Sequence, residues 1–291
     1  MAASVSIVIP AYNRAAVIGA AIESVLSQAH PGVGGTGETI IVDDGSTDDL
    51  AGALRCFKEK VRLIRHDRNQ GAAAARNTGI AAASGTYVAF LDSDDVWLPG
   101  KLTAQINFME AHGYSASCTA YLLKYPDSSS FVSPRFATGK LGLADLVWGC
   151  FVSPGSTLAC RREVFGEIGA LDETLRRLED WDWLMRYTMG RPLGFLAQPL
   201  ARVEVAPGGD PAKVVDALDR LEKKHVGALP PRERRHFKAA LHVERVAAYH
   251  RSGCRRGAAA GLARSFCLAP VGNQALAAVL HNRLRRWRAR F

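Results

Sequence analysis

A chain of 291 residues, 48% of them hydrophobic, is long enough to bury one large core, or a core with a smaller appendage. No run approaches 18 uncharged apolar residues, which argues against a membrane-spanning helix. The net charge of +9 comes from residues 251–291, which hold nine arginines and no acidic residue and leave 28 basic and 28 acidic residues elsewhere. Such a basic segment indicates an anionic partner, either lipid headgroups or nucleic acid.

The first residues and the cysteines bear on where the protein works. Residues 1–4 lead directly into a strand pattern, without a basic segment or a cleavage site, so we expect no signal peptide. The six cysteines are scattered and form no Cys-x-x-Cys pair, a spacing that is typical of reduced thiols. We therefore expect a cytoplasmic protein.

The first part of the chain alternates short apolar runs with helical patterns. The apolar runs predict strands at residues 5–9, 39–42, 61–64 and 87–91. Helical spacing predicts helices at 16–28, from about 48 to 57, at 72–83 and at 99–112. Because the runs are continuous rather than alternating, we expect strands that are buried on both faces. This order is typical of a parallel, doubly wound α/β sheet.

The pattern changes beyond Gly113 and again at Asp210. The middle part predicts strands at 116–125, 131–136 and 156–160, and helices at 143–148, 162–168 and about 181–189. From Asp210 the chain is helical, with Asp210 and Pro211 as a helix cap and first residue. We expect one domain at 1–208, with a nucleotide-binding half at about 1–112 and an acceptor half at about 113–208. A basic helical extension would occupy 209–291.

Three carboxylates, Asp92, Asp94 and Asp95, follow the strand that we expect at 87–91. Carboxylates this close repel one another, and a divalent cation would relieve the repulsion. Hard oxygen ligands with positions left for phosphate are the usual protein part of a Mg²⁺ or Mn²⁺ site. The simpler alternative is a strand that ends in a turn, with Asp95 capping the segment that follows.

Polar side chains also follow the first two predicted strands. Tyr12 and Asn13 come after the first strand, and Asp43 and Asp44 come after the second. Because the carboxyl ends of parallel strands lie side by side, we expect these motifs and the three carboxylates to converge on one crevice. A tight turn with a helix cap would explain Gly45, but it does not require two adjacent carboxylates.

With these residues assembled, the first 200 or so positions resemble the family 2 glycosyltransferases, which are inverting enzymes of the GT-A fold. The motifs that carry the resemblance agree in order and spacing and occupy residues 10–14, 42–48, 69–71, 75–79, 91–95 and 179–182. The resemblance implies a Rossmann-like α/β fold, with a mostly parallel sheet flanked by helices. It also implies transfer of a sugar from a nucleotide diphosphate sugar to an acceptor hydroxyl, with Mn²⁺ or Mg²⁺.

The resemblance assigns roles on the donor side. Tyr12 would lie against the nucleobase, and Asp44 would accept a hydrogen bond from a uracil-type N–H, which favours a UDP-sugar donor. Arg76 would sit near the nucleotide and hold a phosphate or Asp44. Asp92 would contact the ribose, and Asp94 would bind the metal. The expected donor-binding residues are Pro10, Tyr12, Asn13, Asp44, Arg76, Asp92, Ser93 and Asp94, with Asp94 and Asp92 as metal ligands.

Inversion needs one base on the acceptor side, and the resemblance implies that this base is Asp180. Glu179 is its competitor, and an acid here could instead stabilise the first turn of a helix by about 0.3–1 kcal/mol. Trp181 and Trp183 could form a stacking face for a sugar ring or belong to the core. Many relatives carry a histidine after the last sheet strand, but residues 202–207 contain none, so no protein ligand beyond the two aspartates is identified.

The last segment, 276–291, has the pattern of a basic amphipathic helix. Its apolar stripe consists of Leu276, Leu280, Leu284, Trp287 and Phe291, beside five arginines. A basic helix with an aromatic edge is typical of a peripheral membrane anchor, here on the inner face of the membrane. The alternatives are a packed terminal helix and a helical pair that holds a dimer. If the anchor forms, the acceptor could be a lipid-linked saccharide used in surface polysaccharide assembly.

Other functions fit the sequence less well. A sugar nucleotidyltransferase would carry Gly-x-Gly-x-Arg after the first strand, where this chain has Pro10-Ala11-Tyr12-Asn13. A non-catalytic nucleotide-sugar-binding module would be favoured if Asp92, Asp94 or Asp180 were missing. We expect no nucleic acid partner, because aromatic residues are not interleaved with the basic tail beyond Trp287.

Overall fold

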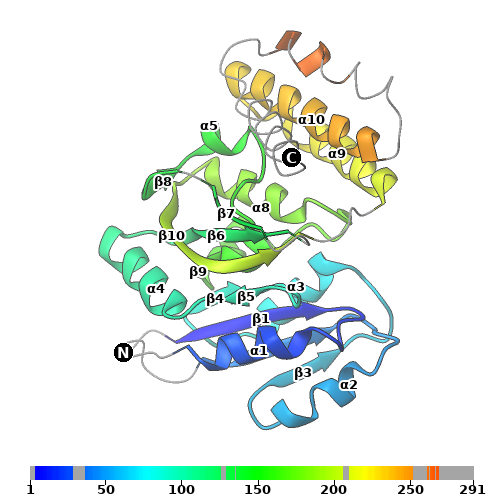
Figure 1. The fold of residues 1–291 in the computed structure, drawn as a ribbon. Coiled ribbons are helices and arrows are strands. Elements are labelled where there is room, and N and C mark those ends of the chain that lie inside the picture. The colour runs from blue at the N-terminus through cyan, green and yellow to red at the C-terminus, as the bar shows by residue number, and fades with distance from the viewer. Residues whose placement is uncertain are drawn as a thin grey trace. The chain divides into compact units, whose positions relative to one another are not determined.

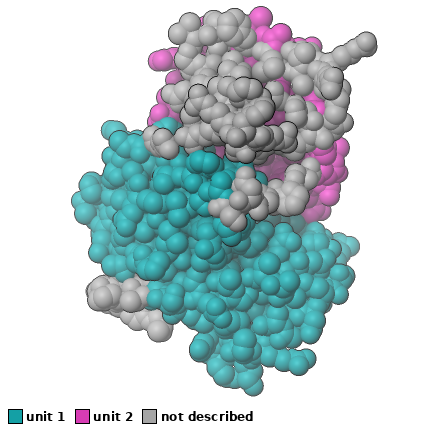
Figure 2. Space-filling view, viewed as in Figure 1, with its two compact units in different colours: residues 1–141, 151–174, 186–205 teal, residues 142–150, 175–185, 206–291 magenta. Residues whose placement is uncertain are grey.

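The computed structural model describes residues 4–28, 37–125, 129–134, 136–205 and 210–251, together with 261, 263–265 and 267–268. Figure 2 shows the two compact units of the chain. Unit 1 comprises 1–141, 151–174 and 186–205, and unit 2 comprises 142–150, 175–185 and 206–291. The basic segment 276–291 lies outside the described residues. None of the described helices combines the length and the apolar character that a membrane span requires.

Unit 1 is built on a ten-stranded mixed sheet (Figure 1). Its hydrogen-bonded order is β3 (Arg62–Arg65), β2 (Thr39–Asp43), β1 (Val5–Ala11), β4 (Tyr87–Phe90), β9 (Ala159–Arg161), β6 (Ala116–Lys124), β10 (Leu193–Glu204) and β5 (Val96–Trp97). β7 (Ser130–Ser133) pairs with β6, and β8 (Gly139–Leu141) pairs with β10. The α/β sheet expected from the sequence is confirmed, and the strands β3-β2-β1-β4 are parallel. Beyond β4 the β6–β10 pair is parallel, whereas β9, β5, β7 and β8 run antiparallel to their partners.

The apolar runs of β1, β2 and β4 form strands that are buried on both faces, as predicted, but the prediction was wrong for β3, in which three of the four residues are exposed. Every residue of β2 and β4 is buried, and Val8 and Ile9 of β1 are fully covered. Helix α3 (Ala72–Ala82) packs on β1 and β2, and its small side chains permit a close approach. A Cβ atom at Gly79 would clash with the side chain of Val8, so only glycine fits at this contact.

The other helices of unit 1 differ from the sequence patterns, because α6 was not expected and the rest are shorter than predicted. They are α1 (Ile18–Leu26), α2 (Leu50–Ala53), the 3₁₀ turn Arg55–Phe57, α4 (Lys101–His112), α6 (Pro154–Thr157) and α7 (Val164–Ile168). The strand expected at 156–160 begins only at Ala159, and this prediction was wrong for Ser156 and Thr157. Pro154 occupies the first position of α6, where its fixed φ favours a helical turn.

Unit 2 contains α5 (Leu143–Leu146), α9 (Pro211–His225) and α10 (Pro231–Arg251). Helix α8 (Glu179–Thr188) begins in unit 2 and ends in unit 1. Asp210 caps α9 as predicted, since its carboxylate accepts a hydrogen bond from Ala212 N at 2.9 Å. One face of α9 is buried, and it carries Val214, Leu218, Leu221 and His225.

Trp181 and Trp183 belong to the core of unit 2. Each is only 1% exposed. The Trp181 indole donates to the Leu146 carbonyl oxygen at 2.8 Å and packs edge-on against Phe237. The suggested stacking face for a sugar ring is therefore wrong, and the alternative of a core position is confirmed.

Candidate functional site

The strand order places the motifs of unit 1 at a point where the topology reverses. From β1 the chain proceeds outward through β2 and β3, and it then returns to β4 on the other side of β1. Open α/β sheets bind ligands beyond the carboxyl ends of the strands at such a reversal. Tyr12 follows β1 there and is 42% exposed, and Asp92 follows β4. The exposed ring of Tyr12 is free to stack on a planar ligand group.

Asn13 fixes the loop after β1 to the loop after β2. Its backbone has a φ of +53°, a left-handed conformation that asparagine tolerates better than most residues. Its side-chain oxygen accepts hydrogen bonds from Thr47 N at 2.8 Å and Asp48 N at 3.3 Å. Its own N–H donates to Ser46 Oγ at 2.9 Å. Asn13 therefore holds these two loops together, and Pro10 lies within β1, where it pairs with Val42 of β2.

The two adjacent carboxylates after β2 have different partners. Asp43 Oδ1 accepts from Ser46 N at 2.8 Å, which stabilises the turn at Gly45. Asp43 Oδ2 lies 3.4 Å from the Arg65 guanidinium. The turn therefore uses only one of the two adjacent carboxylates, that of Asp43. The carboxylate of Asp44 has a different role.

Asp44 is 3% exposed and holds the loop that precedes α3. Its Oδ1 accepts from Gln70 N at 2.8 Å, and its Oδ2 accepts from Gly71 N at 2.7 Å. His66 Nδ1 also donates to Oδ1 at 2.8 Å, and His66 Nε2 lies 2.9 Å from Thr78 Oγ1. A carboxylate offers about four acceptor positions, so this arrangement leaves one for a further N–H. The sequence did not single out His66, which lies on a turn without a recognisable motif.

Arg76 and Asp92 form a close ion pair between α3 and the end of β4. Arg76 is buried, and its Nη2 donates to Asp92 Oδ1 at 2.6 Å. The backbone N–H of Asp92 donates to Ser156 Oγ at 3.1 Å. A Cβ atom at Gly155 would clash with Asp92 Oδ2 and lie 2.9 Å from Arg76 Nη2. A larger residue at 155 would therefore require the ends of these two side chains, or the α6 turn, to shift.

Asp94, like Asp92, is partly exposed and has a cationic neighbour. Its Oδ2 lies 3.5 Å from Arg14 Nη2. Burial raises the pKa of Asp94, the charge of Asp92 raises it further, and the Arg14 guanidinium partly offsets both effects. Ser93, between the two aspartates, is buried. Arg14 belongs to the 10–14 motif, but the sequence indicates no separate role for it.

Asp95 anchors the acidic turn to the neighbouring elements instead of capping the next helix. It is buried, and it accepts hydrogen bonds from Ser156 Oγ and from Glu204 N, the latter at 2.9 Å. Burial raises the pKa of Asp95 to about 8, and the neighbouring Asp92 contributes to the shift. The capping role considered for Asp95 is therefore wrong, and a tie to β10 takes its place.

Glu204 lies in residues 202–207, the segment in which many relatives carry a histidine and this chain has none. The antiparallel register of β10 and β5 pairs Ala201 with Trp97 and Arg202 with Val96, which brings the end of β10 to the acidic turn. Glu204 lies 3.2 Å from Lys124 Nζ and 3.5 Å from Arg202 Nε. Across the described part of the chain, no three His, Cys, Asp or Glu side chains group as a metal site. A cation here would use Asp94 and Asp92 and take its other ligands from the bound nucleotide or water.

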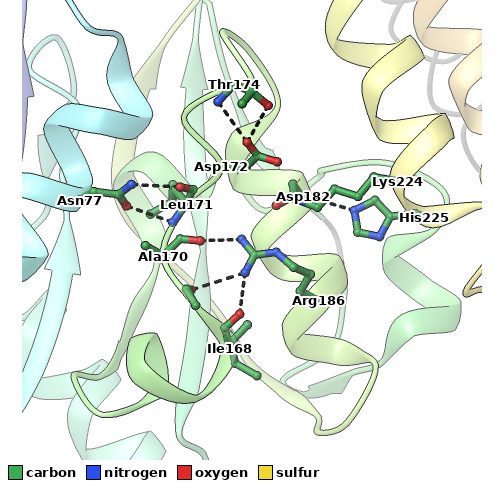
Figure 3. Close-up of polar contacts among 11 residues, drawn as sticks. Asn77, Ile168, Ala170, Leu171, Asp172, Thr174, Asp182, Arg186, Lys224 and His225 are labelled. Atoms are coloured by element: carbon green, nitrogen blue, oxygen red, sulfur yellow. Dashed lines mark hydrogen bonds and ion pairs between the residues drawn. The ribbon is translucent and has the colours of Figure 1, made fainter.

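Two side chains in unit 1 hold the segment that precedes Asp180 (Figure 3). Asn77 Nδ2 donates to the Leu171 carbonyl oxygen at 2.9 Å, and Asn77 Oδ1 accepts from Leu171 N at 3.0 Å. Arg186 donates to the carbonyl oxygens of Ile168 and Ala170, each at 2.7 Å. Asn77, which lies within the 75–79 motif next to Arg76, therefore has a structural role.

Asp180 lies in unit 2 and is the second residue of α8. Its Oδ1 accepts a hydrogen bond from Trp181 N at 2.7 Å. Asp182, two residues further on, is fully buried and accepts from His225 Nε2 at 2.8 Å and Lys224 Nζ at 2.9 Å (Figure 3). Asp182 thus joins α8 to α9 and has a structural role. The expected donor-binding residues all lie in unit 1, whereas the expected base lies in unit 2.

Comparison with known proteins gives one family. The family model described as "Glycosyl transferase family 2" matches residues 6–169. A candidate teichuronic acid biosynthesis glycosyltransferase of Bacillus subtilis, TuaG, is 37% identical over 171 residues, which are 56% of this chain and 64% of that protein. WfaP of Escherichia coli, named as a UDP-Glc:alpha-D-GlcNAc-diphosphoundecaprenol beta-1,3-glucosyltransferase, is 41% identical over 121 residues, which are 41% of this chain and 47% of WfaP. The first four curated relatives are matched over 17%, 19%, 19% and 64% of their lengths.

The fold is similar to that of a solved glycosyltransferase. The crystal structure of Staphylococcus aureus TarS 1–349 in complex with UDP-GlcNAc superposes with a TM-score of 0.61 at 19% identity. The match covers 94% of this chain and 75% of that one. At this identity the similarity establishes the GT-A fold.

Proposed function

Because the chain belongs to glycosyl transferase family 2, we propose that it moves a sugar from a UDP-sugar to an acceptor hydroxyl with inversion. One observation carries the proposal furthest. The ion pair of Arg76 and Asp92, with the partly exposed Asp94 beside it, lies at the end of β4 where the strand order reverses. This is the place at which an open α/β sheet receives a nucleotide.

Two residues support uridine as the nucleoside. Tyr12 presents an exposed ring that can stack on the base. Asp44 retains an acceptor position, and a carboxylate accepts the N3–H of uracil. The pairing edge of adenine presents an unprotonated nitrogen at the corresponding position, which a carboxylate would repel. The donor is therefore a UDP-sugar in preference to an adenine nucleotide sugar.

The acidic turn fits a Mn²⁺ or Mg²⁺ ion by its chemistry. Asp94 and Asp92 provide hard oxygen ligands, and burial and mutual repulsion raise the pKa of Asp94, so that a nearby cation would stabilise its charged form. When bound, such an ion neutralises the negative charge that develops on the leaving diphosphate. Arg76 keeps Asp92 in place through their hydrogen bond.

Asp180 is the proposed base. The proposal rests on the family motif at residues 179–182, and on the structural roles of its neighbours Trp181 and Asp182, which leave the acidic positions Asp180 and Glu179 for chemistry. The Asp180 carboxylate would take the proton of the acceptor hydroxyl as its oxygen attacks the anomeric carbon. The bond to the diphosphate breaks in the same displacement, which inverts the anomeric configuration.

The relatives support a saccharide acceptor linked to a lipid diphosphate. WfaP is named for transfer to alpha-D-GlcNAc-diphosphoundecaprenol, and TuaG is named for teichuronic acid biosynthesis. One name concerns a lipid-linked saccharide acceptor, and the other the biosynthesis of a polymer. We extend this class to the present chain, with the basic segment 276–291 as a peripheral membrane contact.

A transfer assay tests this function. The protein would be incubated with Mn²⁺, with a panel of UDP-, GDP- and ADP-sugars, and with a short-chain analogue of GlcNAc-diphosphoundecaprenol. We expect release of UDP that depends on the acceptor, and a product whose anomeric configuration, determined by NMR, is opposite to that of the donor. A product with retained configuration, or turnover of a GDP- or ADP-sugar alone, would contradict the proposal.

A further inference from the structure

The backbone around Arg14 is held on both sides by the loop after β2. On one side, Asn13 Oδ1 accepts from Thr47 N at 2.8 Å. On the other, Ala15 N donates to Asp48 Oδ2 at 2.8 Å. The Arg14 carbonyl oxygen accepts from Val17 N and Ile18 N, each at 3.0 Å, where α1 begins. The Cα atom of Arg14 therefore has a fixed position, from which only its long side chain can move.

That side chain reaches from the end of β1 to the acidic turn after β4. Arg14 Nη2 lies 3.5 Å from Asp94 Oδ2, with side-chain exposures of 43% and 33%. This distance is long for a charge-assisted hydrogen bond, so the contact is a loose ion pair. Loose, partly exposed ion pairs contribute little to stability, typically about 0–1 kcal/mol. The contact can therefore be exchanged for another at small cost.

The other acids of the turn have closer partners than Asp94. Asp92 is bound by Arg76 at 2.6 Å, and Asp95 accepts from Glu204 N at 2.9 Å. Asp94 meets its cation at the longest of these distances, 3.5 Å. A divalent cation at Asp94 would repel the Arg14 guanidinium, and the diphosphate that accompanies the cation would attract it. Guanidinium groups bind phosphate oxygens well, often through two hydrogen bonds.

We propose that Arg14 is a further donor-binding residue, which neutralises Asp94 in the empty site and transfers to the diphosphate of the donor when metal and nucleotide bind. This proposal rests on the proposed function, since it requires a nucleotide diphosphate at the same site. It assigns to the arginine of the 10–14 motif a role separate from those of Tyr12 and Asn13, which serve the base and the loop.

The exchange predicts two effects of opposite sign for Arg14→Met. Removal of the guanidinium frees Asp94, so the affinity for Mn²⁺ alone, measured by electron paramagnetic resonance of free Mn²⁺, should rise about two- to fivefold. The same variant loses a charged hydrogen-bond donor to phosphate, so its Kd for UDP in saturating Mn²⁺ should rise by about tenfold or more in calorimetry. The Kd for uridine should be unchanged, and Arg14→Lys should recover part of the affinity for UDP.

Arg191→Met is a matched control, because Arg191 also forms a partly exposed ion pair in unit 1, with Glu167 at 2.7 Å. It should change neither affinity. Three results would overturn the proposal: unchanged affinities in Arg14→Met, weaker UDP binding without tighter Mn²⁺ binding, or a parallel loss of both with a lower melting temperature. If the wild-type protein does not bind UDP, the proposed function itself fails. If it binds UDP and the Arg14 variants behave like wild type, only this inference fails.

Discussion

Arg76 Nη2 donates a hydrogen bond to Asp92 Oδ1 at 2.6 Å, and this pair joins two motifs that are separated by 16 residues. The pair connects α3, which packs on β1 and β2, with the end of β4. It therefore fixes the acidic turn relative to the loop that contains Asp44. In the function proposed above, the position of this turn would decide where the diphosphate of the donor binds.

The close approach around this pair predicts a strong effect of Gly155→Ala. The added Cβ would clash with Asp92 Oδ2 and crowd Arg76 Nη2, so the pair or the α6 turn must shift. We expect a loss of about 1–3 kcal/mol in the free energy of unfolding, typical of overpacked sites, together with weaker UDP binding. Urea denaturation and calorimetry measure the two effects. Gly166→Ala is the control, since its Cβ would meet no atom within 4 Å, and an equal response of both variants would contradict this explanation.

The assignment of the base predicts that Asp180→Asn separates binding from transfer. The amide cannot accept the acceptor proton, so the transfer rate should fall by about 10²–10⁴-fold while the Kd for UDP stays within twofold of wild type. Rapid-quench measurement of product formation with saturating donor checks the first effect. Glu179→Gln should retain most activity. If the two variants exchange these behaviours, Glu179 is the base.

Buried Lys101 predicts an unusual dependence of stability on pH. The side chain is fully buried above the Trp97 ring, its Nζ donates to Gln105 Oε1 at 2.6 Å, and burial lowers its pKa to about 7. The unfolded chain keeps this proton up to about pH 10.5, so between pH 7 and 10.5 the unfolded state binds more protons. Below pH 7 the folded protein therefore bears the full free-energy cost of burying the charged Lys101 amine. This cost decreases as the pH rises from 7 to 10.5.

Lys101→Met removes that cost. The variant should be about 1–4 kcal/mol more stable than wild type at pH 7, and the difference should shrink towards pH 10. Urea denaturation at several pH values measures it. Lys58→Met serves as control because Lys58 is exposed, and its difference from wild type should not vary with pH. A stability difference for Lys101→Met that stays constant with pH would show that the buried amine does not titrate as described.

If residues 276–291 contact the membrane, removing them should reduce the binding of the protein to liposomes. A chain ending at residue 272 loses five arginines and the apolar stripe of this segment. Full-length protein should float with liposomes that contain anionic lipids, less so at high salt, and the truncated chain should remain in the bottom fraction. Flotation of both forms to the same extent would exclude the segment as the anchor.

Much of the fold could be predicted because its signals are local. The apolar runs of β1, β2 and β4 specify buried strands, and the side chains that follow each run mark the carboxyl ends. The strand β5 was not predictable, since its two residues, Val96 and Trp97, become a strand only through pairing with β10. The helical turn at Ser156 likewise depends on Pro154 and on the neighbouring acidic turn.

The sequence motifs predicted which residues form the candidate site, but not which residues form hydrogen bonds with them. The motifs name Asp44 and Asp92, but nothing local in the sequence indicates that His66 binds the first. The roles of Trp181 and Asp182 depend on contacts with residues far along the chain, such as Phe237 and His225. Periodicity places these side chains on a helix without showing which of them the rest of unit 2 covers.

The most direct test of the central claim is calorimetric titration of UDP into the wild-type protein and Asp94→Asn, each with and without Mn²⁺. We expect Mn²⁺ to strengthen UDP binding to the wild type by at least tenfold and to have no effect on Asp94→Asn, because the amide removes the negative charge of the proposed principal metal ligand. Circular dichroism melting shows whether the variant remains folded. Equal strengthening by Mn²⁺ in both proteins, or UDP binding to the wild type that Mn²⁺ does not change, would contradict the claim.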